Sequence, residues 1–182
     1  MRANNRRRVL NAPRGWGAAA LFVAAVALAP LTGAGRPFQN PPNEPKAAPQ
    51  QNAPDPWGLA ETVEPADLVK ELRDPIPANR PTVACVGFHF LYDGGHVPGA
   101  SFHGPGSKED GIADLRKWAQ GLPRAANVVL YCGCCPLERC PNLRPAFVAM
   151  HDMGFTHLRV LLLAHNFGTD WAAKGYPVER GK

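Results

Sequence analysis

Four of the five cysteines in this chain of 182 residues stand within nine consecutive positions. They are Cys132, Cys134, Cys135 and Cys140, in the stretch Cys-Gly-Cys-Cys-Pro-Leu-Glu-Arg-Cys. Random placement would rarely gather one residue type so closely, so the cluster indicates a dedicated role. Cysteine thiolates act as nucleophiles, form disulfides and bind soft metal ions. The fifth cysteine, Cys85, lies in an apolar run, and we expect it to be a buried, unreactive side chain.

The cluster follows the strongest strand signal in the sequence, residues 127–131 (Asn-Val-Val-Leu-Tyr), and precedes a helix that ends at Gly154. Phe147 and Met150 are predicted on the core-facing side of that helix. A loop between a strand's carboxyl end and a helix N-terminus presents unpaired backbone N–H groups and the positive end of the helix dipole. Both favour a thiolate, so the sequence predicts a lowered pKa for Cys132 and identifies it as the nucleophile.

The predicted active-site loop supplies further candidates. Its members after the nucleophile are Gly133, Cys134, Cys135, Pro136, Leu137, Glu138 and Arg139. Arg139 and Arg144 could hold an anionic substrate.

The remaining pattern predicts alternating helices and strands. Helices are expected at residues 64–72 and 112–120, and strands at 82–86 and 157–163, with Trp171 in a last short helix. Such alternation is typical of an α/β domain with a mostly parallel central sheet flanked by helices.

The N-terminal segment is predicted to serve export. Residues 1–34 combine a basic stretch, an apolar run and small residues, the layout of an export signal, and residues 5–10 resemble a twin-arginine motif. Residues 35–56 form a proline-rich linker, and residues 57–182 form the folded domain. We therefore expect a periplasmic or secreted protein with no stable membrane insertion after cleavage of the signal.

The net charge of +5 belongs to the same N-terminal segment. From residue 35 onward there are 15 basic and 15 acidic residues, because five of the 20 Lys and Arg residues precede that point. The charge thus gives no support to nucleic-acid binding.

Four motifs occur in order along residues 64–179. They are Gly-His-Val-Pro-Gly-Ala at 95–100 after Tyr92, Val-Val-Leu-Tyr-Cys at 128–132, Met-Gly-Phe at 153–155, and Trp171 followed by Gly-Tyr-Pro-Val-Glu at 175–179. Together they resemble the rhodanese (sulfurtransferase) family. The resemblance implies a single rhodanese-like domain in which Cys132 carries sulfane sulfur as a persulfide. The sulfur would come from a small donor such as thiosulfate and pass to a thiol or cyanide acceptor, without a cofactor.

The sequence departs from the family pattern at several places. Residues 85–87 (Cys-Val-Gly) stand where the family has Asp-Val-Arg, and residues 165–166 (His-Asn) replace paired glycines. The loop after Cys132 is about five residues longer than usual. The family interval from cysteine to Arg or Thr fits Cys134 and Arg139, whereas the position after the strand favours Cys132. A related phosphatase function is disfavoured, because Glu138 occupies the position of the oxyanion-binding arginine.

Three interpretations of the cluster remain open. A neighbour of Cys132 (Cys134, Cys135 or Cys140) could resolve it as a disulfide, or one disulfide could merely brace the loop. Alternatively, a non-catalytic module could bind a soft metal or a thiol partner through the cluster, although the spacing matches no common zinc pattern. Because the charged residues of the Asp-Val-Arg motif are missing, a fourth interpretation, a catalytically inactive domain, also remains open.

Overall fold

The computed structural model describes residues 54–181 of the chain. The export signal predicted at 1–34 and all but the last residues of the predicted linker lie outside the described residues. Among the helices of residues 54–181, none has the length and apolar character that a membrane crossing requires.

A five-stranded, all-parallel sheet forms the centre of the domain. The strand order is β1-β5-β4-β2-β3, so β4 is a central strand, paired with β5 on one side and β2 on the other. The strands are β1 (Thr62–Val63), β2 (Thr82–Cys85), β3 (Ser101–Phe102), β4 (Asn127–Tyr131) and β5 (His157–Leu161). This arrangement confirms the predicted α/β fold.

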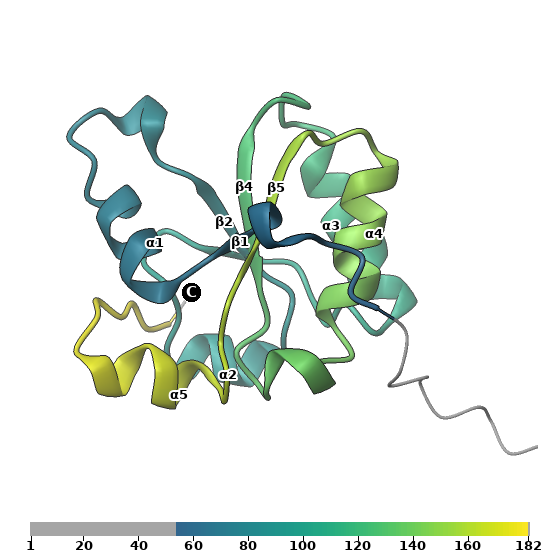
Figure 1. The fold of residues 1–182 in the computed structure, drawn as a ribbon. Coiled ribbons are helices and arrows are strands. Elements are labelled where there is room, and N and C mark those ends of the chain that lie inside the picture. Colours follow the sequence, from purple (N-terminus) through teal and green to yellow (C-terminus); the bar gives the residue numbers. More distant parts are fainter. Residues whose placement is uncertain (1–53, 182) are drawn as a thin grey trace, which may run out of the picture. The chain divides into compact units, whose positions relative to one another are not determined.

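Helices cover both faces of the sheet (Figure 1), with α3 and α4 on one side and α1 and α5 on the other. The α-helices are α1 (Pro65–Leu72), α2 (His89–Gly94), α3 (Glu109–Ala119), α4 (Leu143–Asp152) and α5 (Phe167–Asp170). Short 3₁₀ turns are η1 (Leu59–Glu61), η2 (Pro77–Asn79), η3 (Leu137–Arg139) and η4 (Ala172–Lys174).

Strand β4 divides its side chains between two hydrophobic cores, because successive strand residues point to opposite faces. Val128 and Leu130 belong to the core that α3 and α4 cover, together with Phe147 and Met150 as predicted. The intervening Val129 and Tyr131 belong to the core on the α1 side. Position 132 continues this alternation and falls on the α4 side of the sheet.

Element boundaries differ from the predicted ones in a few places. Helix α3 begins at Glu109 rather than Ile112, because Glu109 and Asp110 suit the positive end of the helix. Helix α2 was not predicted, because its six residues are too few to show a helical period. Trp171 lies between α5 and η4 rather than inside a helix.

Trp171 ties the C-terminal segment to the core, and its replacement tests that connection. The side chain is fully buried, packs against Phe167 and Tyr176, and donates its Nε1–H to the Pro177 carbonyl at 2.7 Å. Trp171→Ala should lower the free energy of unfolding by about 3–5 kcal/mol, through the lost burial and the cavity left behind.

Urea denaturation in reducing buffer measures this loss. The exposed Leu59 is the control, since Leu59→Ala should change stability by no more than about 0.5 kcal/mol. Equal stabilities for the two variants would contradict this packing.

Candidate active site

Strand β4 fixes the position of Cys132, the first residue after it. The strand is held on both sides, and the Tyr131 carbonyl accepts the Val86 N–H at 2.8 Å beyond the last paired residues of β2. The Cys132 side chain joins the core on the α4 side and is only 3% exposed. It therefore lies at the carboxyl end of a rigid central strand, as the sequence predicts, but nearly out of contact with solvent.

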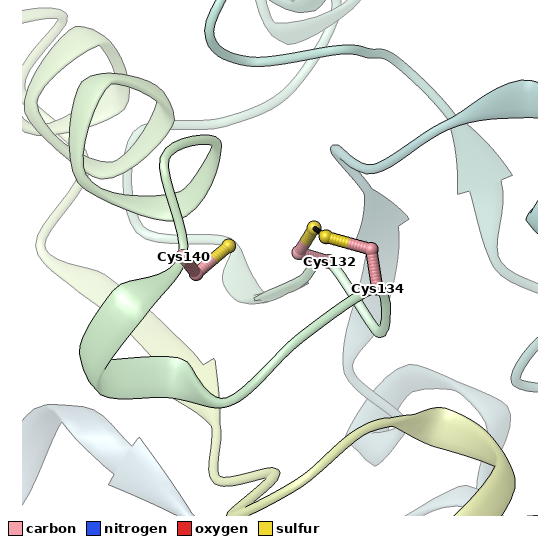
Figure 2. Close-up of side chains that lie close together, drawn as sticks. All are labelled: Cys132, Cys134 and Cys140. Carbon is pink, nitrogen blue, oxygen red and sulfur yellow. Dashed lines mark hydrogen bonds between the residues drawn. The ribbon is translucent and has the colours of Figure 1, made fainter.

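The loop brings the clustered cysteines together around that side chain (Figure 2). The Sγ atoms of Cys132 and Cys134 are 3.0 Å apart, and those of Cys134 and Cys135 are 3.1 Å apart. The Sγ atoms of Cys132, Cys134 and Cys140 all lie within 4.8 Å of one another. Cys140 is buried, whereas Cys134 and Cys135 are half-buried. All of these thiols are free, so no disulfide braces the loop in this structure.

Asn142, which the sequence analysis did not single out, completes the cluster. Its side chain is fully buried, and its Nδ2 donates to Cys132 Sγ at 3.3 Å and more weakly to Cys134 Sγ at 3.9 Å. Its Oδ1 accepts the Ser107 backbone N–H at 3.0 Å. That contact fixes the orientation of the amide, so the NH₂ group must face the sulfur atoms.

The position of Asn142 in the sequence, directly before a predicted helix, suggests a role in capping that helix rather than in binding sulfur. An asparagine directly before a helix is normally interpreted as an N-cap. Asn142 does precede α4, yet its side chain makes no capping hydrogen bond. The residue directs its polar atoms at the cysteines instead.

Gly87 allows Cys132 to pack closely against the end of β2, because glycine has no Cβ atom. A Cβ atom at position 87 would lie 2.4 Å from the Cys132 carbonyl oxygen and 3.3 Å from its Sγ. Position 87 is where the family's Asp-Val-Arg motif has its arginine. The replacement of that arginine by glycine therefore makes room for Cys132 at this position. Cys85 is buried beside them, and burial raises its pKa to about 11, in agreement with the predicted unreactive thiol.

The thiols share their charge in a way that the sequence did not predict. Hydrogen bonds from the thiols of Cys132 and then Cys140 lower the pKa of Cys134 to about 2. The pKa of Cys132 is raised, because its proton is held in hydrogen bonds with Cys134 and Cys140 and because the group is buried. Burial likewise raises the pKa of Cys135. The cluster therefore loses one proton easily and retains the others.

This finding corrects the predicted source of thiolate stabilisation. Backbone N–H groups were expected to lower the pKa of Cys132 itself. In the structure the donor to its sulfur is the Asn142 side-chain amide, and the Cys132 thiol itself donates to Cys134. The ionised form belongs to the Cys132–Cys134 pair, which titrates as a unit.

The remaining loop residues hold the cluster in place. Gly133 has a positive φ of 75°, and its carbonyl accepts the Phe167 N–H at 3.0 Å. Pro136 precedes η3, whose Leu137 N–H donates to the Leu163 carbonyl at 3.1 Å. The enlarged loop is thus attached both to α5 and to the segment after β5.

The two candidate arginines differ in their surroundings. The Arg144 guanidinium donates to the carbonyls of Cys140 (3.2 Å) and Glu138 (3.0 Å) and pairs with Asp55 at 2.5 Å. It therefore braces the loop. The exposed side chain of Arg139, on η3, forms no salt bridge within residues 54–181 and stays available to an anion.

Residues 165–166, which replace the family's paired glycines, organise α5. The Asn166 side chain accepts the Thr169 N–H at 2.9 Å and caps the helix. His165 bonds to Asp170 through its ring and its backbone N–H. Neither residue makes a hydrogen bond with the cysteine sulfurs in the described part of the chain.

Thiolate absorbance in the far ultraviolet tests the shared charge. A free cysteine has a pKa of about 8.5, so its thiolate disappears as the pH falls below that value. The cluster should instead retain one thiolate from about pH 8 down to about pH 4, because the pKa of Cys134 is lowered.

Removing the amide donor should weaken this effect. Asn142→Ala should raise the apparent pKa of that thiolate by about 1–2 pH units, since a hydrogen bond to a charged group contributes about 1.5–3 kcal/mol. Asn79→Ala, an exposed asparagine on η2, is the matched control. A wild-type thiolate signal that vanished below about pH 8 would contradict the assignment.

Comparison with known proteins finds relatives by structure only. No protein-family model matches the sequence, and no curated protein matches it significantly. A crystal structure of the Alr3790 protein from Anabaena sp is 23% identical, covering 65% of this chain and 82% of that one, with a TM-score of 0.50. A solution structure of the rhodanese-like domain of the same protein is 23% identical, covering 66% and 79%, with a TM-score of 0.48.

A thiosulfate sulfurtransferase from Pseudomonas aeruginosa is also similar, at 23% identity and a TM-score of 0.44. The match covers 67% of this chain and 20% of that one. The match to the Alr3790 crystal structure, at 23% identity and a TM-score of 0.50, shows a common fold and leaves the activity to other arguments. The fold agrees with the ordered motifs at 95–100, 128–132, 153–155 and 171–179. The folded part of this chain is therefore a rhodanese-like domain in its fold.

Proposed function

We propose that this protein is a sulfurtransferase that carries sulfane sulfur as a persulfide on Cys132. The observation that carries the proposal is the buried Asn142 amide, which is oriented by Ser107 and donates to Cys132 Sγ at 3.3 Å. A fixed N–H donor at the end of a central strand suits a sulfur that bears negative charge, as a thiolate or as a persulfide anion. The rhodanese-like fold supports the same chemistry.

The first step would load the sulfur. Cys132 passes its proton along the existing hydrogen bond to Cys134, whose Sγ is 3.0 Å away, and attacks the outer sulfur of thiosulfate. The new S–S bond forms as the S–S bond of the donor breaks, and sulfite departs with the bonding electron pair. The negative charge then rests on the outer sulfur of the Cys132 persulfide.

The second step would unload it. A thiolate or cyanide attacks the outer sulfur, and Cys132 leaves as a thiolate, which restores the starting cluster. Because Cys132 is only 3% exposed, the site suits small anionic donors and acceptors. The exposed Arg139 would attract such anions, whereas Arg144 is engaged with the loop carbonyls.

We also propose that the chain works outside the cytoplasm, as a periplasmic or secreted protein. The support is the export signal predicted at 1–34.

Sulfur transfer from thiosulfate to cyanide tests the function through thiocyanate formation. Cys132→Ser should lower the rate by about a thousandfold or more, because the attacking sulfur is gone. Cys85→Ala replaces a buried cysteine outside the cluster and should keep the wild-type rate. Full activity of Cys132→Ser together with loss of activity in Cys134→Ser would move the persulfide to Cys134.

A second candidate function is the binding of a soft metal ion. The Sγ atoms of Cys132, Cys134 and Cys140 lie within 4.8 Å of one another. Zinc–sulfur bonds are about 2.3 Å long, so an ion between the three sulfurs could bind all of them after small shifts. Thiolate ligands favour copper(I) and zinc.

Titration of the reduced full-length protein with zinc or copper(I) tests this alternative. Binding should reach one equivalent, and Cys140→Ser should weaken it by more than about tenfold, the cost seen for lesser changes at metal sites. Cys85→Ala should bind like the wild type. Bound metal should also stop sulfur transfer, since Cys132 would serve as a ligand; weak binding that survives Cys140→Ser would exclude the site.

A further inference from the structure

We infer that Cys134 acts as an internal acceptor that reduces the Cys132 persulfide and releases sulfide. The protein would then be a dithiol-dependent thiosulfate reductase and would need no external thiol to remove the sulfur. The inference rests on the proposed function, because it requires the persulfide on Cys132. It adds a second reaction and a second product.

The positions of the two sulfurs carry the inference. Cys134 Sγ lies 3.0 Å from Cys132 Sγ, within the range from which a reacting atom can attack. The glycine between them, Gly133, has a φ of 75°, which turns the chain so that the two side chains face one another (Figure 2). Both thiols are free, so the pair is available to form a disulfide.

Cys134 is better placed for this role than the other cysteines of the loop. Cys140 belongs to the same group of sulfurs, but it is 1% exposed, and within residues 54–181 its sulfur makes no contact with another sulfur as short as the 3.0 Å between Cys132 and Cys134. Cys135 contacts Cys134 at 3.1 Å but is not one of the three cysteines whose sulfurs all lie within 4.8 Å of one another. Cys134 therefore reaches the persulfide-bearing sulfur first, and its partial exposure lets an external reductant reach it afterwards.

The reaction balances without an oxidant. Cys134 sulfur attacks the Sγ of Cys132, a Cys132–Cys134 disulfide forms, and the bond to the outer persulfide sulfur breaks. That outer sulfur takes the electron pair and the Cys134 proton and leaves as hydrosulfide. The outer sulfur is reduced and the two cysteines are oxidised. An external dithiol then reduces the disulfide, so the complete cycle converts thiosulfate and a dithiol into sulfite, sulfide and an oxidised dithiol.

An intramolecular acceptor has a large advantage over a dilute external one, because it is always in position. Without a reductant the protein should therefore turn over once and stop. This single turnover gives a stoichiometric test.

The experiment treats the reduced, desalted full-length protein with excess thiosulfate and no added thiol. Sulfite and sulfide are measured per chain, together with the intact mass. We expect one sulfite and one sulfide for each chain, and a final mass lower by two hydrogens than that of the reduced protein. Sulfite without sulfide, with one extra sulfur kept on the chain, would overturn the inference and leave the proposed function standing. Absence of sulfite would instead overturn the proposed function.

Tryptic cleavage locates the disulfide in the wild-type protein. Trypsin cuts after Arg124 and Arg139, which separates Cys140 from the other three loop cysteines. After alkylation, the peptide 125–139 should carry one alkyl group, on Cys135, and Cys140 should be alkylated in its own peptide. A disulfide that links the two peptides would assign the acceptor role to Cys140 and overturn the inference.

Cys134→Ser supplies the matched variant. Its Cys132 is loaded with inorganic polysulfide, so that loading does not depend on Cys134 as a proton acceptor. The loaded variant should keep its persulfide and release no sulfide, whereas loaded wild type and Cys85→Ala should release it. Equal sulfide release from Cys134→Ser and wild type would overturn the inference.

Discussion

The cost of holding negative charge on buried sulfur governs this site. Cys132 is 3% exposed, so water contributes little to stabilising an anion there. The donors that replace water are neutral: the Asn142 amide donates to Cys132 Sγ, and the thiols of Cys132 and Cys140 donate to the ionised Cys134. Each loop feature that positions those donors therefore matters to the chemistry. The positive-φ Gly133 brings Cys134 to its partner, and the Ser107 backbone orients the amide.

The fold was largely predictable from the sequence, because its strongest signals are local. The apolar run at 127–131 forms β4, and the side chains of Phe147 and Met150 pack on the predicted face of α4. Those two elements fix the cysteine loop between them, so the location of the candidate site was also predictable. Short elements such as α2 were missed, since tertiary packing rather than periodicity stabilises them.

The inner arrangement of the site was not predictable, because it depends on contacts between distant segments. Asn142 faces the sulfurs because the backbone N–H of Ser107, 35 positions earlier, donates to its Oδ1 and so fixes the orientation of the amide. The sharing of one negative charge among the thiols depends on sulfur separations that spacing in the sequence does not define. Backbone N–H groups were expected to stabilise the Cys132 sulfur, but the Asn142 side chain does so instead. From its position directly before α4, Asn142 would normally be interpreted as the N-cap of that helix.

Gly87 limits which residues can stand beside Cys132 in this domain. Its missing Cβ is what allows the Cys132 carbonyl to lie where it does. An arginine placed at that position would collide with the backbone of the loop. The Asp-Val-Arg pattern and the present position of the Cys132 carbonyl therefore exclude each other, and a design that restores the arginine must also rebuild the loop after β4.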